Sequence, residues 1–247
     1  MSLTRANLKE TVRKQYLYKL NANIDVFSSL VGIQLLALLF SLGGVGSSGM
    51  SGSGYTVDVK YYSSDLVIAF TLIWALVTAI TITTKPNRNH DFTFVTNRLS
   101  SSLSNILFLL TASVIGAITA SMSGGLLQVV SSLLFDQYSY TLNIGGAKDV
   151  VIGFAVTVLY LFLVNAFGYF IGALVQVSKL FILLIPVLAI GSLFSAAFTQ
   201  KEPILINIFQ FFVMESMLSL FIVKAVLTTF VLFVLAITVF NRMEVRR

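Results

Sequence analysis

Few side chains in this sequence could carry out chemistry. His90 is the only histidine and cysteine is absent, which excludes thiol nucleophiles, thiolate metal sites and disulfides. The segment 145–148, Gly-Gly-Ala-Lys, lacks the spacing of a phosphate-binding loop, and we interpret it as a turn. The candidate carboxylates on the predicted outer side, near apolar segments, have no histidine partner: Asp136, Asp149, Glu202 and Glu215. We therefore predict that the chain is not an enzyme and that it holds no cofactor or metal of its own.

The elements that must position these few polar groups are apolar runs of membrane-spanning length. The chain has 247 residues, of which 57% are hydrophobic and only 11% charged, whereas soluble domains carry about 25% charged residues. Each bilayer crossing takes about 20 mostly apolar residues. Six runs approach this length, near 26–43, 66–84, 104–122, 150–175, 180–198 and 225–240. We predict an all-α polytopic membrane protein with six transmembrane helices in a single domain over residues 1–247.

The polar segments between these runs complete the predicted architecture. Residues 1–24 are basic and partly amphipathic, which favours an interfacial helix, with a frayed basic tail as the alternative. Gly and Ser dominate 44–54, so we expect a flexible loop there. The run 126–135 is too short to span and either lies at the outer surface or extends the third span. The segment 203–218 mixes polar with large apolar residues, which predicts outer re-entrant or interfacial helices.

Lysine and arginine counts in short loops predict the orientation, because cytoplasmic loops carry the excess. With both termini inside, the inner segments hold Arg5, Lys9, Arg13, Lys14, Lys19, Lys85, Arg88, Arg98, Lys179, Arg242, Arg246 and Arg247. The outer segments hold only Lys60, Lys148, Lys201 and Lys224. We therefore predict that both termini are cytoplasmic. The basic residues flank apolar runs and form no separate basic face, so their expected partners are anionic lipids and not nucleic acid.

The six predicted spans contain no Asp, Glu, Lys, Arg or His. Ion-coupled transporters and proton pumps usually keep ionisable residues in mid-membrane, and intramembrane proteases need buried catalytic groups there. Both classes are therefore disfavoured. If the protein moves a solute uphill, a partner must supply the energy.

The predicted cytoplasmic loop 85–103 offers a docking segment for such a partner. Phe92 and Phe94 are two aromatic rings in a polar stretch, where they could serve as apolar anchors with Asp91 and Arg98 as polar rim contacts. The alternative is that both rings lie in the lipid headgroup layer. His90, in the same loop, is interpreted as a solvated residue.

Small residues inside the predicted spans indicate close helix–helix packing, and polar residues there could line a translocation path. Gly168 and Gly172 form a GxxxG pair, which allows close helix approach within one subunit or between two. One face of the second span carries hydroxyls and one indole ring without charge: Thr71, Trp74, Thr78 and Thr81. This face could line a path for an amphipathic or apolar solute. Threonines that bond to their own backbone are an equally good explanation.

The layout resembles the permease subunits of bacterial ABC transporters of the type-2 exporter family. The similarity rests on the basic interfacial start, the six spans with both ends inside, the loop Asp91–Arg98 and the outer stretch 203–218. In such permeases the loop after the second span couples to a separate cytoplasmic ATPase, which binds ATP and Mg²⁺, and two permease subunits form the pathway. The resemblance implies these roles here, in a bacterial plasma membrane.

The function expected from these features is export of a hydrophobic or amphipathic substrate, such as a membrane-active peptide, a lipid or a drug. The ATPase and a second permease, either another copy or a paralogue, are the expected partners. The main alternative is a non-transporting membrane anchor or an immunity protein that protects by binding. A membrane enzyme acting on lipid would need a polar catalytic cluster at one interface, and the sequence offers none.

Overall fold

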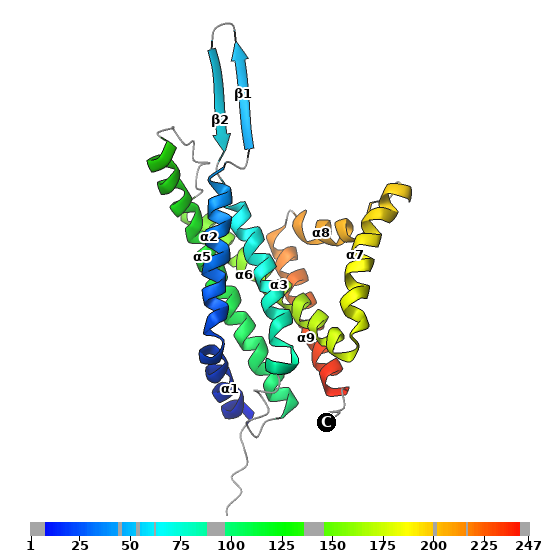
Figure 1. The fold of residues 1–247 in the computed structure, drawn as a ribbon. Helices are drawn as coiled ribbons and strands as arrows, with labels where there is room; N and C mark the ends of the chain where they lie inside the picture. Colours follow the sequence, from blue (N-terminus) through cyan, green and yellow to red (C-terminus); the bar gives the residue numbers. More distant parts are fainter. Residues whose placement is uncertain are drawn as a thin grey trace, which may run out of the picture.

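The computed structural model describes residues 8–43, 46–52, 55–61, 63–87, 97–135, 146–199, 202–215 and 217–242. Apart from one β-hairpin, the described chain is helical (Figure 1). Its elements are α1 (Leu8–Ala22), α2 (Ile24–Ser41), β1 (Gly46–Gly52), β2 (Tyr55–Tyr61), α3 (Asp65–Ile82), α5 (Arg98–Phe135), α6 (Ala147–Val177), α7 (Leu180–Thr199), α8 (Ile204–Val213) and α9 (Leu218–Arg242).

Five helices in the described residues are long and apolar enough to cross a membrane, which is the pattern of a multi-pass membrane protein. They are α2, α3, α5, α6 and α9. The fifth predicted span coincides with α7, which has 20 residues but is not among these five helices. The count of six spans and the orientation of the chain therefore stay predictions.

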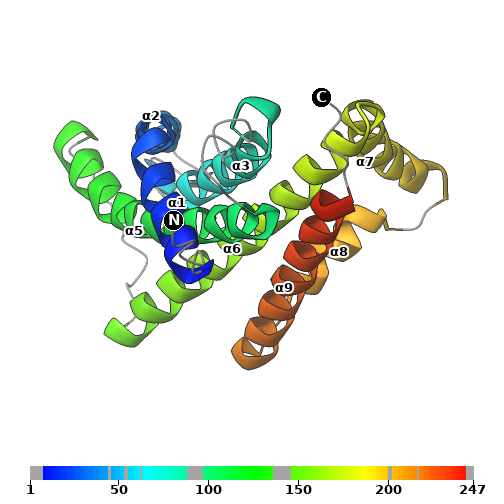
Figure 2. The ribbon, with the colours of Figure 1, turned by 90° about the horizontal axis from the view of Figure 1, so that it is seen from below.

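Helix α6 runs obliquely through the bundle, between two groups of helices. Viewed from below, α2, α3 and α5 lie on one side of it, and α8 and α9 lie on the other (Figure 2). The helix α7 stands beyond the end of α6, and its large apolar side chains are mostly exposed. The core between α3, α5, α6 and α9 pairs aromatic rings with small residues: Ala79, Phe108, Ala166, Tyr169, Ala173, Phe233 and Ala236. A second cluster packs α2 against α3, α5 and α6: Leu30, Trp74, Ala75, Ala112, Ala117 and Leu161. Surfaces that face lipid can stay apolar.

Gly168 and Gly172 lie where α6 crosses α3. A Cβ atom on Gly168 would come within 2.7 Å of the backbone oxygen of Leu76 and 2.8 Å of Cβ of Ala79. A Cβ atom on Gly172 would collide with the hydroxyl of Thr83. The GxxxG pair therefore permits contact between two helices of the same chain.

The structure decides between the two alternatives for the run 126–135. Helix α5 continues through Gly124 and Gly125 to Phe135, so its 38 residues measure about 57 Å at 1.5 Å per residue. Each helical glycine costs about 1 kcal/mol relative to alanine, yet an interruption would leave backbone groups without partners. In the turns that follow these glycines, Leu127 and Ser131 are each about 2% exposed, so this part of α5 packs against the rest of the protein. The run 126–135 therefore extends the third helix.

The Gly/Ser-rich segment predicted as a flexible loop forms part of a β-hairpin. β1 pairs antiparallel with β2, with Gly46 opposite Tyr61 and Gly52 opposite Tyr55. The sequence of β2, Tyr-Thr-Val-Asp-Val-Lys-Tyr, is rich in β-branched and aromatic residues that favour strands. Strand β1 pairs with β2 through backbone N–H and C=O groups, which every residue of β1 supplies. Pairing with β2 therefore outweighs the low strand propensity of the Gly and Ser residues in β1. The hairpin projects from one end of the bundle (Figure 1).

The opposite end of the bundle collects α1, the end of α3, the start of α5 and the end of α9 (Figure 1). We call it the basic end, because it gathers described basic residues of several helices: Lys9, Arg13, Lys14, Lys19, Lys85, Arg98 and Arg242. This is the end that the positive-inside rule assigns to the cytoplasm.

Candidate functional site

Residues 85–87 and 97–103 of the predicted coupling loop 85–103 are described, and residues 98–103 form the first turns of α5 instead of a loop. Asp91, Phe92 and Phe94 lie outside the described residues, but Arg98 is the first residue of α5. Its guanidinium Nη1 donates to the backbone oxygens of Phe240 and Asn241, at 3.3 and 3.2 Å. These carbonyls belong to the last turn of α9, where a cation is favoured by the helix dipole. Arg98, predicted as a rim contact for a partner, thus also connects α5 to α9.

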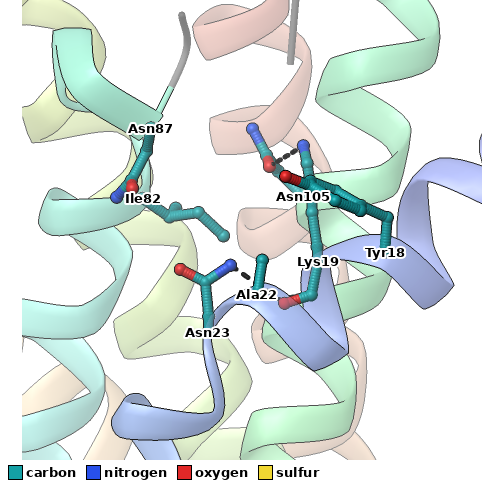
Figure 3. A pocket seen from close by; sticks show the side chains of 7 residues that line it. All are labelled: Tyr18, Lys19, Ala22, Asn23, Ile82, Asn87 and Asn105. Carbon is teal, nitrogen blue, oxygen red and sulfur yellow. Dashed lines mark hydrogen bonds between the residues drawn. The ribbon is translucent and has the colours of Figure 1, made fainter. Parts of the chain in front are cut away.

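A second set of contacts connects α5 to α1. The ammonium of Lys19 donates to Oδ1 of Asn105 and, at 3.3 Å, to the backbone oxygen of Ser101. Lys19 is 4% exposed and Asn105 is 7% exposed, and both line a small pocket between α1, the end of α3 and α5 (Figure 3). Within α1, the buried positions Val12, Gln15 and Lys19 follow helical spacing, so this face packs against α5.

Asn105 extends these contacts to α6 and α9. Its Nδ2 donates to the hydroxyl of Tyr169, at 3.4 Å. The buried ring of Tyr169 packs against Phe233 and Phe240, with ring centroids 5.7 and 5.5 Å apart. We call Lys19, Arg98, Asn105 and Tyr169 the basal cluster. It joins α1, α5, α6 and α9 at the basic end.

Sequence reasoning predicted none of the contacts of the basal cluster. From the sequence alone, Lys19 is one of the basic residues that predict the orientation, and Asn105 and Tyr169 belong to no motif. The available signal was the helical spacing of Lys19 with Val12 and Gln15, which places it on the packed face of α1.

The predicted path residues on α3 face two different environments. Thr71, Trp74 and Thr78 are at most 6% exposed. Thr71 accepts a hydrogen bond from Gln34 of α2 at 3.1 Å, and the Trp74 indole N–H donates to the hydroxyl of Ser29 at 3.0 Å. These contacts hold α3 against α2.

Thr81, the fourth predicted path residue, is exposed and bonds to the backbone oxygen of Val77, 2.8 Å away. The structure thus brings three of the four residues together and leaves Thr81 outside. Their role in a path stays a prediction.

The buried polar side chains of the described bundle include Asn165 and Gln34, two amides that the sequence did not point to. Asn165 of α6 is completely buried, and its Nδ2 donates to the hydroxyl of Ser113 at 2.8 Å. Gln34 reaches the backbone oxygen of Gly116 at 3.5 Å as well as Thr71. Among the buried side chains of the described ranges, Lys19 is the only Asp, Glu, Lys, Arg or His. The described interior between the two ends therefore holds polar side chains but no ionisable one of these types.

The opposite end has one partly buried ion pair, between Glu215 and Lys224. The ammonium of Lys224 also lies 4.2 Å from the ring centroid of Phe211 in α8. Tyr160 of α6 donates its hydroxyl to the backbone oxygen of Phe212, at 2.9 Å. These contacts fix α8 to α6 and α9, and α8 lies between α7 and α9 (Figure 1).

The start of α9 changes one sequence-based boundary. The helix begins at Leu218, seven residues before the predicted span, and therefore includes Lys224. The ion pair with Glu215 compensates that charge, which is why a lysine is tolerated in the helix.

No family model, curated protein or solved structure matches this chain. Within the described ranges, no group of three or more His, Asp or Glu side chains is placed to hold a metal ion.

Proposed function

We propose that this chain is the permease subunit of an ATP-driven exporter that works with a separate cytoplasmic ATPase. The observation that carries the proposal is the basal cluster, which includes Arg98 and Asn105 of α5, the helix that follows the segment 88–96 in the chain. That segment joins α3 to α5, and α5 is bonded to α1 through Lys19 and to α9 through Arg98. A force applied to the segment by a partner would therefore reach four helices. This is the mechanical requirement for coupling ATP hydrolysis to rearrangement of a bundle.

The uncharged interior supports the same assignment. A carrier driven by protons or sodium ions needs groups in the membrane that bind and release the ion. The described interior offers amides and hydroxyls, such as Asn165 and Thr71, but its only buried charge is at the basic end. In our proposal, ATP and Mg²⁺ act on the partner subunit, and this chain provides the pathway.

The proposed cargo is hydrophobic or amphipathic: a membrane-active peptide, a lipid or a drug. Such a cargo needs no charged binding site in the membrane. A second permease, either another copy or a paralogue, would complete the pathway, and the exposed apolar helix α7 leaves room for such a neighbour. The expected location is a bacterial plasma membrane with the basic end in the cytoplasm.

Affinity capture from the native membrane tests this function. The chain, tagged at its C-terminus and extracted in mild detergent, should co-purify with a protein that carries a phosphate-binding loop, identified by mass spectrometry. A helical membrane protein of similar size from the same cell is the control. Capture of the chain without any nucleotide-binding protein, in several mild detergents, would contradict the proposal and favour a membrane anchor or an immunity protein.

A further inference from the structure

The β-hairpin stands apart from the helices. It projects from the end of the bundle opposite the basic end, with its strands along the direction of the helices (Figure 1). Among the described elements, β1 and β2 make extended contact only with each other. An isolated two-stranded hairpin is at best marginally stable in water, and a third strand that extends an apolar face is one way to stabilise it. The described part of the chain supplies no third strand.

Strand β1 has an outer edge that the described chain leaves unpaired. Its inner edge pairs with β2 over seven positions, from Gly46 opposite Tyr61 to Gly52 opposite Tyr55. On the outer edge, every second residue directs its backbone N–H and C=O groups away from β2. These groups are available to a further strand.

The sequence of β1 does nothing to protect this edge. Natural edge strands are commonly protected by charged residues, by proline or by a bulge. The sequence Gly-Ser-Ser-Gly-Met-Ser-Gly contains no charge and no proline, and its register with β2 is uninterrupted. Strand β2, by contrast, carries Asp58 and Lys60. Glycine inside a strand often marks a position where another backbone approaches closely, and β1 has three glycines.

The hairpin also has one apolar face. Successive residues of a strand lie on opposite faces, so Tyr55, Val57, Val59 and Tyr61 share one face of β2. The register places Met50 opposite Val57, on the same face. This alternation is typical of a strand with one covered face. A third strand with apolar residues at every second position would extend the apolar face while it pairs with the edge.

The chemistry of the edge selects an extended polypeptide as its partner. A repeating row of backbone donors and acceptors matches the backbone of another strand, whereas a lipid or a small drug has no such repeat. A second copy of this chain fits poorly. Two copies in one membrane share an orientation, so their β1 strands run in the same direction along the bundle (Figure 1). They cannot pair antiparallel, and parallel pairing is less stable per residue.

We propose that the outer edge of β1 binds an extended amphipathic peptide as a third, antiparallel strand. A peptide that is not tied to the membrane can take the antiparallel direction that a second copy cannot. In the predicted orientation the hairpin lies outside the membrane, so the peptide reaches it from that side. Only the description of this peptide as the cargo, in preference to a lipid or a drug, rests on the proposed function. The binding itself needs no ATPase.

A labelled peptide with the sequence of residues 55–61 tests the site, because this sequence already pairs with β1 in the hairpin. Fluorescence anisotropy measures its binding to the purified full-length chain in detergent. Wild-type chain should bind the peptide saturably. A variant with residues 46–61 replaced by a short Gly/Ser linker should bind it at least tenfold more weakly. A peptide with proline in place of both valines should lose binding to a similar extent, because proline cannot donate to a strand ladder.

Two single substitutions form a matched pair in the same hairpin. Gly49→Lys introduces into β1 the kind of charge that protects natural edges and should weaken binding several-fold. The new lysine would lie opposite Asp58, so the substitution also supports the pairing of β1 with β2. Lys60→Gln changes a charge on β2, leaves the outer edge of β1 intact and should not alter binding. A photoreactive benzophenone at the centre of the peptide should cross-link to residues 46–52.

Four outcomes would overturn the proposal. They are no saturable binding by wild type, equal binding by the variant without the hairpin, equal binding of the proline peptide, and cross-links confined to the helices. If the variant without the hairpin does not fold, unchanged binding by Gly49→Lys decides against the site. All of these measurements use the chain without an ATPase. A negative result would therefore leave the exporter function standing, and failure to capture an ATPase would leave the peptide site standing.

Discussion

Replacing Gly168 with leucine is expected to destabilise the bundle by about 3 kcal/mol, the upper part of the range for an overpacked core. The side chain would have to occupy the space where α6 meets α3, within 2.7 Å of the backbone oxygen of Leu76. Backbone cannot move aside as a flexible side chain does, so the two helices must separate. Unfolding of the purified protein in increasing sodium dodecyl sulfate, followed by circular dichroism, measures the loss.

Gly153→Leu is the matched control for this prediction. Gly153 lies in the same helix, and a Cβ atom there would meet nothing within 4 Å. Its substitution should change the unfolding midpoint little. Equal destabilisation by the two variants would show that the effect comes from helix propensity and not from the contact between α3 and α6.

The second large effect is expected from the double variant Phe92→Asp with Phe94→Asp. If both rings anchor the ATPase, each contributes on the order of 2 kcal/mol, as buried aromatic residues at interface centres do. If the two losses add, the total of about 4 kcal/mol corresponds to a reduction in affinity of roughly 700-fold. The amount of ATPase captured with the tagged chain, at equal chain yield, measures the change.

Two variants control for charge and for ring removal. Asn97→Asp adds a negative charge next to the same segment but removes no ring, and it should leave capture unchanged, because Asp is a favourable residue before a helix start. Phe92→Leu with Phe94→Leu keeps the apolar character and should retain part of the association. Undiminished capture by the aspartate double variant would mean that the ATPase docks elsewhere.

The helices could be predicted from the sequence, because apolar runs of membrane-spanning length have few other folds available. Their ends were less predictable. The glycines at 124 and 125 indicate a break, but α5 continues because its later turns are held by tertiary contacts at Leu127 and Ser131. The hairpin was missed because β1 has no strand propensity of its own and pairs only because β2 does.

The candidate site was less predictable than the fold, because its contacts join distant parts of the chain. Lys19 reaches residues 82 and 86 positions away, and Arg98 reaches a carbonyl 142 positions away. Spacing within a single helix can place Lys19 on a packed face but cannot identify Asn105 as its partner. The GxxxG pair is visible in the sequence, but the sequence does not show that α3 is the helix that packs against it.

Our central claim is that ATP hydrolysis by a partner drives movement of a cargo through this chain. Proteoliposomes that contain the chain and its captured ATPase test it most directly, with a fluorescent amphipathic peptide and a short-chain fluorescent phospholipid as probes. We predict that the chain stimulates ATP hydrolysis and that at least one probe moves across the bilayer only with ATP and Mg²⁺. ATP hydrolysis that is unaffected by the chain, together with no ATP-dependent movement of either probe, would contradict the claim.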